Sequence, residues 1–209
     1  MSGDPRPDEA GPTPVFASAL ANEQFILQSV SSSTISESSG RAALYLSALS
    51  SGLVAIGFAS ASDSILSAIT FTVLPTVFLL GCFTVVRLID TSVENLVVLR
   101  RIERIRQYWV TLSPDGERFF EADSATGGHR GVRYGTWAML FTTASMVIVV
   151  NAVVAGSIVT VFLVRVEGLT RAVGVPIGAG VALVVAGSAL VYQHSRITRL
   201  VLGAGDPGR

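Results

Sequence analysis

Four long intervals without a charged residue constrain the fold of this 209-residue chain more than any other feature of its sequence. The intervals hold 21, 23, 31 and 24 residues and are bounded by Arg41 and Asp63, Asp63 and Arg87, Arg133 and Arg165, and Arg171 and Arg196. A helix needs about 20 mostly apolar residues to cross the hydrocarbon core of a bilayer. Each interval therefore predicts one membrane-spanning helix.

The composition agrees with a membrane protein. Only 14% of the residues are charged and 50% are hydrophobic, whereas soluble domains carry about 25% charged residues. Hydrocarbon offers no partners for open backbone groups, and there are too few segments for a barrel, so the spans must be helices. We expect an all-α, polytopic protein with four transmembrane helices near residues 42–61, 65–86, 136–164 and 173–192, within a four-helix domain at 42–192.

The arginines predict the topology. All 15 basic residues are Arg, and 13 of them lie in the two terminal segments and in the long segment at 87–135, against two in the connection between the last two spans. Basic residues stay on the cytoplasmic side of a membrane. We expect a multi-pass protein of the plasma (inner) membrane with both termini in the cytoplasm. The net charge of zero gives no reason to expect nucleic acid as a partner.

The amino-terminal segment divides into two parts. Residues 1–14 are rich in Pro and acidic residues, which predicts a disordered tail. Residues 15–41 carry Phe16, Leu20, Leu27 and Val30 near one helical face, which predicts an amphipathic cytoplasmic helix. Its polar face is not basic, so packing on another helix is favoured over a position on the membrane surface. We expect a second cytoplasmic tail at 193–209.

The second span has no Gly or Pro between Arg87 and Pro114, so we expect it to continue into the cytoplasm to about Leu112, followed by a short helix and a loop up to residue 135. Its apolar residues follow a heptad-like spacing: Val98, Ile102, Ile105, Trp109 and Leu112. Such a seam needs a cover, which is either the amino-terminal helix or a second subunit. The other side carries the arginines Arg100, Arg101, Arg104 and Arg106, which either contact anionic lipid head groups or form a solvated face that sets topology.

Small residues at every fourth position of the last span predict close helix packing, within the chain or between subunits. They are Gly174, Gly178, Ala182 and Ala186. Asn151 is the most polar residue deep in the membrane and falls near the midplane of its span. It is either an interhelical hydrogen-bonding group or, with Ser47 and Ser51 of the first span, part of a pore lining.

Residues that would support catalysis are missing from the spans, which hold no ionisable acid or base. The one cysteine, Cys82, excludes paired-thiol chemistry within one chain, and His129 and His194 lie outside the apolar segments where haem ligands would be needed. We expect a protein that is not an enzyme and has no catalytic, metal or cofactor site.

The segments Asn22-Glu23-Gln24-Phe25, Ile35-Ser36-Glu37 and Gly40-Arg41-Ala42-Ala43-Leu44-Tyr45-Leu46 resemble a group of uncharacterised actinobacterial multi-span integral membrane proteins. The resemblance covers about the first sixty residues and implies no catalytic role. The layout of spans and cytoplasmic helix is also similar to membrane effectors of nucleotide-activated bacterial defence systems. The leading hypothesis is a non-enzymatic membrane protein that forms a homo-oligomer or scaffolds a helical partner through its cytoplasmic helices. The alternative is a pore-forming channel or effector of bacterial signalling or defence.

Overall fold

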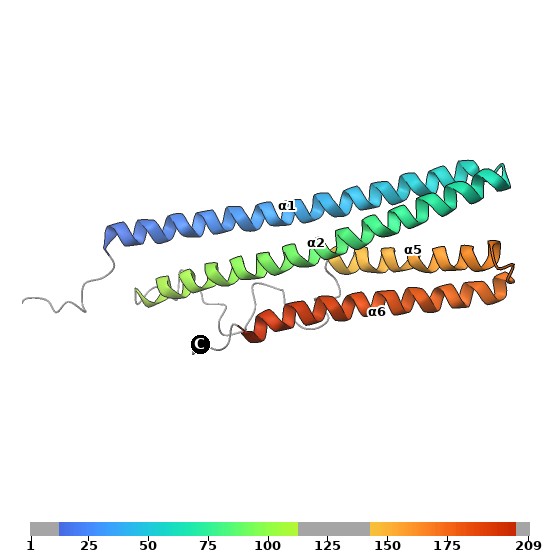
Figure 1. Cartoon of the computed structure of the whole chain (residues 1–209). Coiled ribbons are helices and arrows are strands. Elements are labelled where there is room, and N and C mark those ends of the chain that lie inside the picture. Colours follow the sequence, from blue (N-terminus) through green and yellow to red (C-terminus); the bar gives the residue numbers. More distant parts are fainter. Residues whose placement is uncertain (1–12, 113–142, 204–209) are drawn as a thin grey trace, which may run out of the picture. The chain divides into compact units, whose positions relative to one another are not determined.

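The structure, a computed structural model, describes residues 13–112 and 143–203. These ranges form four α-helices: α1 (Pro14–Ala59), α2 (Asp63–Thr111), α5 (Thr143–Arg165) and α6 (Arg171–Gly203), shown in Figure 1. All four are long and apolar enough to cross a membrane by length and composition. The prediction of an all-helical fold with four helices able to span a membrane is therefore confirmed for the described residues.

The chain divides into two compact units. We call the described residues of the first, 13–36 and 94–112, the two-helix unit, and those of the second, 37–93 and 143–203, the four-helix unit. Helices α1 and α2 contribute to both units without a break in either helix. The two units are described separately below.

Local signals in the sequence explain where the helices begin and end. Helix α1 begins at Pro14, whose missing N–H and fixed φ suit the first helical position, and the Thr13 hydroxyl accepts a hydrogen bond from the backbone N–H of Phe16. Helix α5 ends before Gly168, which has a φ of +69°. A glycine adopts this left-handed conformation without steric cost, so the chain can turn back directly into α6.

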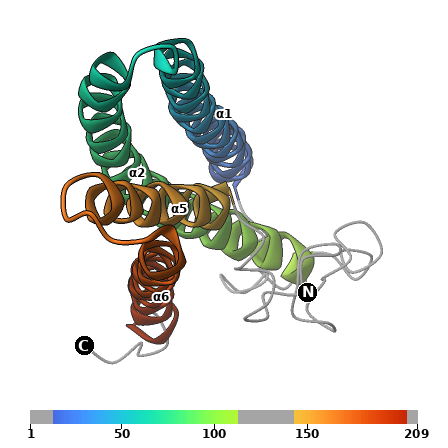
Figure 2. The same ribbon diagram turned by 90° about the vertical axis from the view of Figure 1, so that its right-hand side faces the viewer.

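The core of the four-helix unit lies where α1, α2 and α5 meet. Its buried residues are Ala42, Tyr45, Val77, Val85, Leu88, Ile89, Ala144, Val147 and Ile148. Figure 2 shows α5 lying between α2 and α6, with α6 packed on the side of α5 away from α1. Helix α6 consequently has the least buried apolar segment of the four helices.

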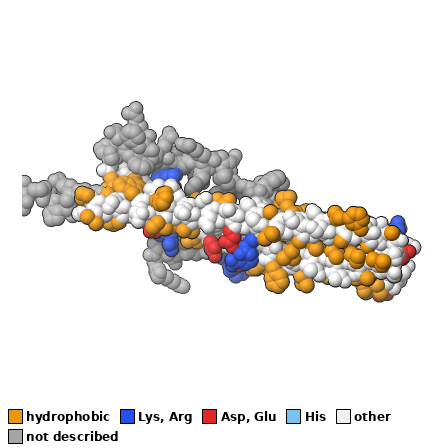
Figure 3. Space-filling model, turned by 90° about the horizontal axis from the view of Figure 1, so that it is seen from above, with side chains coloured by type: hydrophobic (Ala, Val, Ile, Leu, Met, Phe, Trp, Pro, Cys, Tyr) orange, Lys and Arg blue, Asp and Glu red, His pale blue; other side chains and the backbone are white. Residues whose placement is uncertain are grey.

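Large hydrophobic side chains also cover the outside of the four-helix unit. Leu44, Phe58, Phe83, Leu183 and Val184 are all strongly exposed, and Figure 3 shows many such side chains on one face of the molecule. Contiguous exposed apolar surface is unusual for a soluble protein but is what a helix requires against lipid. The exposure pattern therefore supports the membrane assignment independently of helix length.

Two of the predicted segment boundaries fall inside helices. The boundary between residues 41 and 42 falls inside α1, because helix-forming residues continue across it and Gly40 alone does not stop the helix. The cytoplasmic tail predicted at 193–209 is helical to Gly203, as part of α6. Residues 1–12 of the disordered tail predicted at 1–14, the helix and loop after residue 112 and the start of the third span before Thr143 lie outside the described residues. Pro14, the last residue of that predicted tail, is the first residue of α1.

Candidate functional site

A cluster of polar side chains joins three helices inside the four-helix unit. Asn151 of α5 is only 4% exposed, and its Oδ1 accepts a hydrogen bond of 3.3 Å from the hydroxyl of Tyr45 in α1. Its Nδ2 donates to Sγ of Cys82 in α2 over 3.5 Å. We call these three residues the Asn151 cluster. Asn151 thus acts as an interhelical polar contact, one of the two roles predicted for it.

Gly81 gives the Asn151 cluster its close packing. A Cβ atom at Gly81 would overlap the carboxamide of Asn151 and lie 2.8 Å from Cε2 of Tyr45. Only a glycine therefore leaves room for both side chains. The sequence did point to Asn151 but not to its partners, although Tyr45 is the only residue of the first span that combines an aromatic ring with a polar tip.

Ser47 and Ser51, the predicted pore-lining partners of Asn151, lie on the exposed side of α1. Tyr45 rather than either serine reaches Asn151. The reason is helical periodicity, because residues two and six positions from Tyr45 face other directions on a helix with 3.6 residues per turn. The structure does not bring the three predicted polar residues together within the chain.

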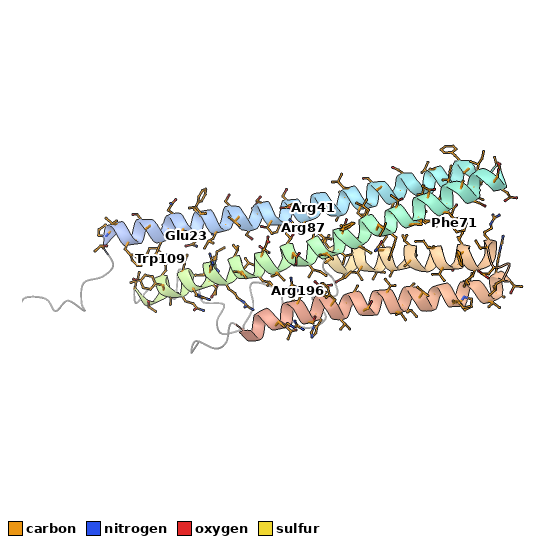
Figure 4. All side chains as sticks on the ribbon, in the orientation of Figure 1. Glu23, Arg41, Phe71, Arg87, Trp109 and Arg196 are labelled. Atoms are coloured by element: carbon orange, nitrogen blue, oxygen red, sulfur yellow. The ribbon has the colours of Figure 1, made fainter. Side chains whose placement is uncertain are left out.

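Charged side chains lie together at one end of the spans. The carboxylate of Glu37 is 2.6 Å from the Arg41 guanidinium and 3.7 Å from that of Arg87, and Asp90 is 3.2 Å from Arg196. Figure 4 shows Arg41 and Arg87 on neighbouring helices. We call these five residues the charged belt. Hydrogen bonding to Arg41, aided by the charges of Arg41 and Arg87, lowers the pKa of Glu37.

The opposite end of the spans carries a separate ion pair, in which Nη1 of Arg165 lies 3.2 Å from Oδ1 of Asp63. We call this pair the charged rim. Along α2, Arg87 lies 24 positions after Asp63, which corresponds to about 36 Å of helix at 1.5 Å per residue. A hydrocarbon core is about 30 Å thick. The belt and the rim therefore have the spacing of the two surfaces of a bilayer.

The position of the Asn151 cluster along the helices can be compared with the belt and the rim. Tyr45 lies four residues from Arg41 and Cys82 five residues from Arg87, or about 6 to 8 Å of helix from the belt. Asn151 is 14 residues from Arg165, or about 21 Å from the rim. Measured along the helices, the Asn151 cluster lies nearer to the belt than to the rim. The expected position of Asn151 near the midplane of its span stays a prediction, because the start of that span lies outside the described residues.

The small residues of α6 pack on α5 of the same chain. A Cβ added to Gly178 would overlap Oγ1 of Thr160 and approach the carbonyl oxygen of Gly156 to 2.5 Å. In return, a Cβ on Gly156 would come within 2.9 Å of the Cβ of Ala182. Gly174 is also buried, against Val164, and Ala186 is half-buried. The stripe predicted for helix packing thus supports the α5–α6 contact within the chain.

In the two-helix unit, α1 and α2 contact each other in antiparallel order. Oγ of Ser31 donates to Oδ1 of Asn95 over 2.7 Å, and the rings of Phe16 and Tyr108 meet edge to face with centroids 5.9 Å apart. Ile102 is buried, and the other residues of the predicted seam are half-buried: Val98, Ile105, Trp109 and Leu112. The amino-terminal part of α1 therefore contacts α2 along the length over which the seam runs.

The four arginines of this unit do not form one face. Arg101 and Arg104 are exposed, whereas Arg100 and Arg106 are half-buried, and Arg106 lies 4.0 Å from the Glu103 carboxylate. Only Arg101 and Arg104 are therefore as accessible to lipid head groups or solvent as the sequence suggested.

The described residues contain no group of three or more His, Cys, Asp or Glu side chains that could hold a metal ion. Every buried side-chain nitrogen and oxygen in the same ranges has a hydrogen-bond partner. The arrangement can therefore hold helices together and position charges at two membrane surfaces. No family model, curated protein or solved structure matches the chain. The resemblance noted for the first sixty residues stays a prediction.

Proposed function

We propose that this chain is a non-enzymatic integral membrane protein that self-associates through its two-helix unit and offers the resulting helical assembly as a scaffold. The four-helix unit anchors it in the plasma (inner) membrane. Both termini and the two-helix unit lie in the cytoplasm. The partners of this protein are the lipid bilayer, further copies of itself and helical proteins that bind the assembled helices.

The charged belt supports this orientation. It holds three of the arginines that the positive-inside rule counts as cytoplasmic, namely Arg41, Arg87 and Arg196. The rim holds Arg165, one of the two counted as external. The residues of the two-helix unit precede Glu37 in α1 and follow Val93 in α2, so in the sequence they lie outside the apolar intervals that begin after Arg41 and end before Arg87.

The observation that carries the proposal is the exposed apolar surface of the two-helix unit. Phe25 is 70% exposed and Ile35 55% exposed. Further large hydrophobic side chains of this unit are also exposed: Val15, Phe16, Ile26, Val30, Val97 and Tyr108. Beyond the membrane these side chains would face water, where burying each large one is worth about 1.5 to 3 kcal/mol. Cover by a second copy or a helical partner removes this cost.

The residues of α1 that face α2 differ from those that the sequence assigned to one amphipathic face. Leu27 is buried and Leu20 half-buried on the side that faces α2, whereas Phe16 and Val30, assigned to the same face from the sequence, are exposed. The covered row instead follows Leu20, Gln24, Leu27 and Ser31 at steps of four, three and four. We therefore infer that α1 packs on α2 through this row and that its remaining exposed apolar side chains serve assembly.

The pore alternative has less support. Both polar ends of the Asn151 side chain are used within the protein, and Ser47 and Ser51 lie on another side of α1. A polar pathway through one chain would need these groups to face a common space. The proposal therefore expects little ion flux when the purified protein is reconstituted in liposomes.

Self-association is tested by measuring the protein mass of the full chain in detergent micelles by light scattering. We expect the native chain to form an oligomer and the double variant Phe25→Ser/Ile35→Ser to have a lower mass with unchanged helix content. The matched control is Ala21→Ser, another exposed position of the same helix. A native chain that stays monomeric at high concentration, or a double variant with the native mass, would contradict the proposal.

A further inference from the structure

An apolar groove runs along the rim half of the four-helix unit, between α1, α2 and α5. Its volume is about 520 Å³. Aliphatic and aromatic side chains from the three helices line most of it, among them Leu53, Ile56, Leu66, Phe71, Val153 and Val161. Among the described residues that line the groove, Arg165 is the only charged one. The groove is thus apolar along its length and has one arginine side chain at its end.

The groove faces the membrane rather than water. Several of its wall residues lie within the apolar intervals and are exposed in the isolated chain, such as Leu53 at 55% and Phe71 at 36%. Phe71 is eight residues from Asp63, which places it about 12 Å of helix from the rim. A flexible hydrocarbon chain that enters from the surrounding bilayer can fill such a space without leaving hydrocarbon.

The rim gives the groove a charge pattern at its end. Nη1 of Arg165 donates to Asp63 over 3.2 Å, and this is the one hydrogen bond of that guanidinium within the described residues. An arginine has five N–H donors, so most of them remain for another acceptor. The side chain of Asp63 is 89% exposed. The rim therefore presents a cation and a carboxylate side by side at the membrane surface.

A zwitterionic phospholipid head group that carries a primary amine matches this pattern. Its phosphate is an acceptor for guanidinium donors, and its ammonium group is a partner for an exposed carboxylate. We propose that the groove binds one acyl chain of an aminophospholipid, with the phosphate against Arg165 and the ammonium group against Asp63. The proposal concerns the membrane unit and does not depend on self-association through the two-helix unit.

Tryptophan quenching by brominated lipids tests the site in the full chain. The two native tryptophans, Trp109 and Trp137, are changed to Phe, and Phe71→Trp then serves as the groove reporter. The control reporter is Ala179→Trp, at an exposed position eight residues from Arg171 at the start of α6 and outside the groove. Each variant is reconstituted with brominated phosphatidylethanolamine, phosphatidylglycerol or phosphatidylcholine in unlabelled phosphatidylcholine.

With the groove reporter we expect the ethanolamine lipid to bind more tightly than the other two by about two- to fivefold, the range that a partly exposed ion pair contributes. With the control reporter the three lipids should quench alike. Asp63→Asn should remove the preference for ethanolamine over choline, and Arg165→Gln should weaken binding of all three lipids at the groove reporter. Leu53→Trp provides a second groove reporter if Phe71→Trp does not fold.

Three results would overturn the proposal. Equal quenching constants for all lipids at both reporters would show that the groove is ordinary lipid-facing surface without selectivity for a head group. A preference for phosphatidylglycerol would mean that the rim selects negative charge and that Asp63 does not hold an ammonium group. A groove reporter that no lipid quenches, beside a normally quenched control reporter, would show that a helix of a second copy fills the groove.

Discussion

Substitution of Gly178 by alanine tests the packing of α6 on α5 with a single added methyl group. The new Cβ would overlap Oγ1 of Thr160 and lie 2.5 Å from the backbone oxygen of Gly156. The first neighbour is a side chain that can rotate, but the second is backbone and cannot move without shifting α5. The two helices must therefore separate locally, and they lose contacts along the stripe that Gly174 and Ala182 share.

The expected cost follows from this geometry. Adding a methyl group to a well-packed interior costs about 1 to 3 kcal/mol when it forces backbone shifts. The replacement of glycine by alanine inside a helix also stabilises the helix by up to about 1 kcal/mol through helix propensity. Gly180→Ala isolates that second contribution, because a Cβ at Gly180 meets nothing within 4 Å. We therefore expect Gly178→Ala to be less stable than Gly180→Ala by about 1 to 3 kcal/mol.

Equilibrium unfolding of the full chain in mixed micelles measures both variants against the native protein. The double variant Thr160→Ala/Gly178→Ala should recover part of the loss, because it removes the side-chain overlap and leaves the Gly156 contact. Such a deviation from additivity is expected for residues in direct contact. Equal stability of the Gly178 and Gly180 variants would refute the close approach of the two backbones on which the reasoning depends.

Three further predictions concern other parts of the molecule. Tyr45→Phe should lower the free energy of unfolding by about 0.6 kcal/mol, the average for an interhelical hydrogen bond in membranes, whereas Ser47→Ala on the exposed side of the same helix should change it little. The arginine partners of Glu37 lower its pKa. The contribution of the Glu37 carboxylate to folding stability is therefore present above the ordinary pKa of 4.5 and is lost as pH falls through the lowered pKa. In unfolding experiments below that lowered pKa, the native chain and Glu37→Gln should have the same stability. In a cysteine-free background, a cysteine at Gly168 should react with a membrane-impermeant thiol reagent added to intact cells and one at Ser113 should not, and the reverse labelling pattern would contradict the proposed orientation.

The presence of four helices that are long and apolar enough to span a membrane could be predicted because the signal is local. A charge-free interval such as the 23 residues after Asp63 has few alternatives in a chain of this composition, since hydrocarbon requires every backbone group to be paired within the segment. The stripe at Gly174 and Gly178 was visible for the same reason, because spacing along one helix fixes which residues share a face. The element that these residues pack against, α5, could not be read from the spacing.

The contacts between helices could not be predicted from one sequence. Asn151 was recognisable as a polar residue in an apolar segment, but its partner depends on how α1 is rotated, and a rotation of about 200° separates Tyr45 from Ser47. For the seam on α2, the sequence likewise left open whether the amino-terminal helix or a second subunit covers it. Ile102 is buried within the chain's own fold, so Ile102→Glu would destabilise the two-helix unit itself and cannot serve to separate subunits. Self-association is therefore tested at the exposed residues Phe25 and Ile35.

The two halves of the four-helix unit are held together in different ways. On the belt side, hydrogen bonds cross between helices, from Tyr45 to Asn151 and from Ser145 to Gln193. On the rim side, α5 and α6 pack through Gly156 and Gly178, and the hydrogen bonds between helices lie at the surface pair Arg165–Asp63 and between Thr160 and Gly174. There α1, α2 and α5 leave the apolar groove between them. Polar contacts fix the rotation of a helix more strictly than apolar ones, because an unpaired polar group in hydrocarbon is costly. Changes in lipid occupancy should therefore alter the rim side of α1 and α2 and leave the Asn151 cluster in place.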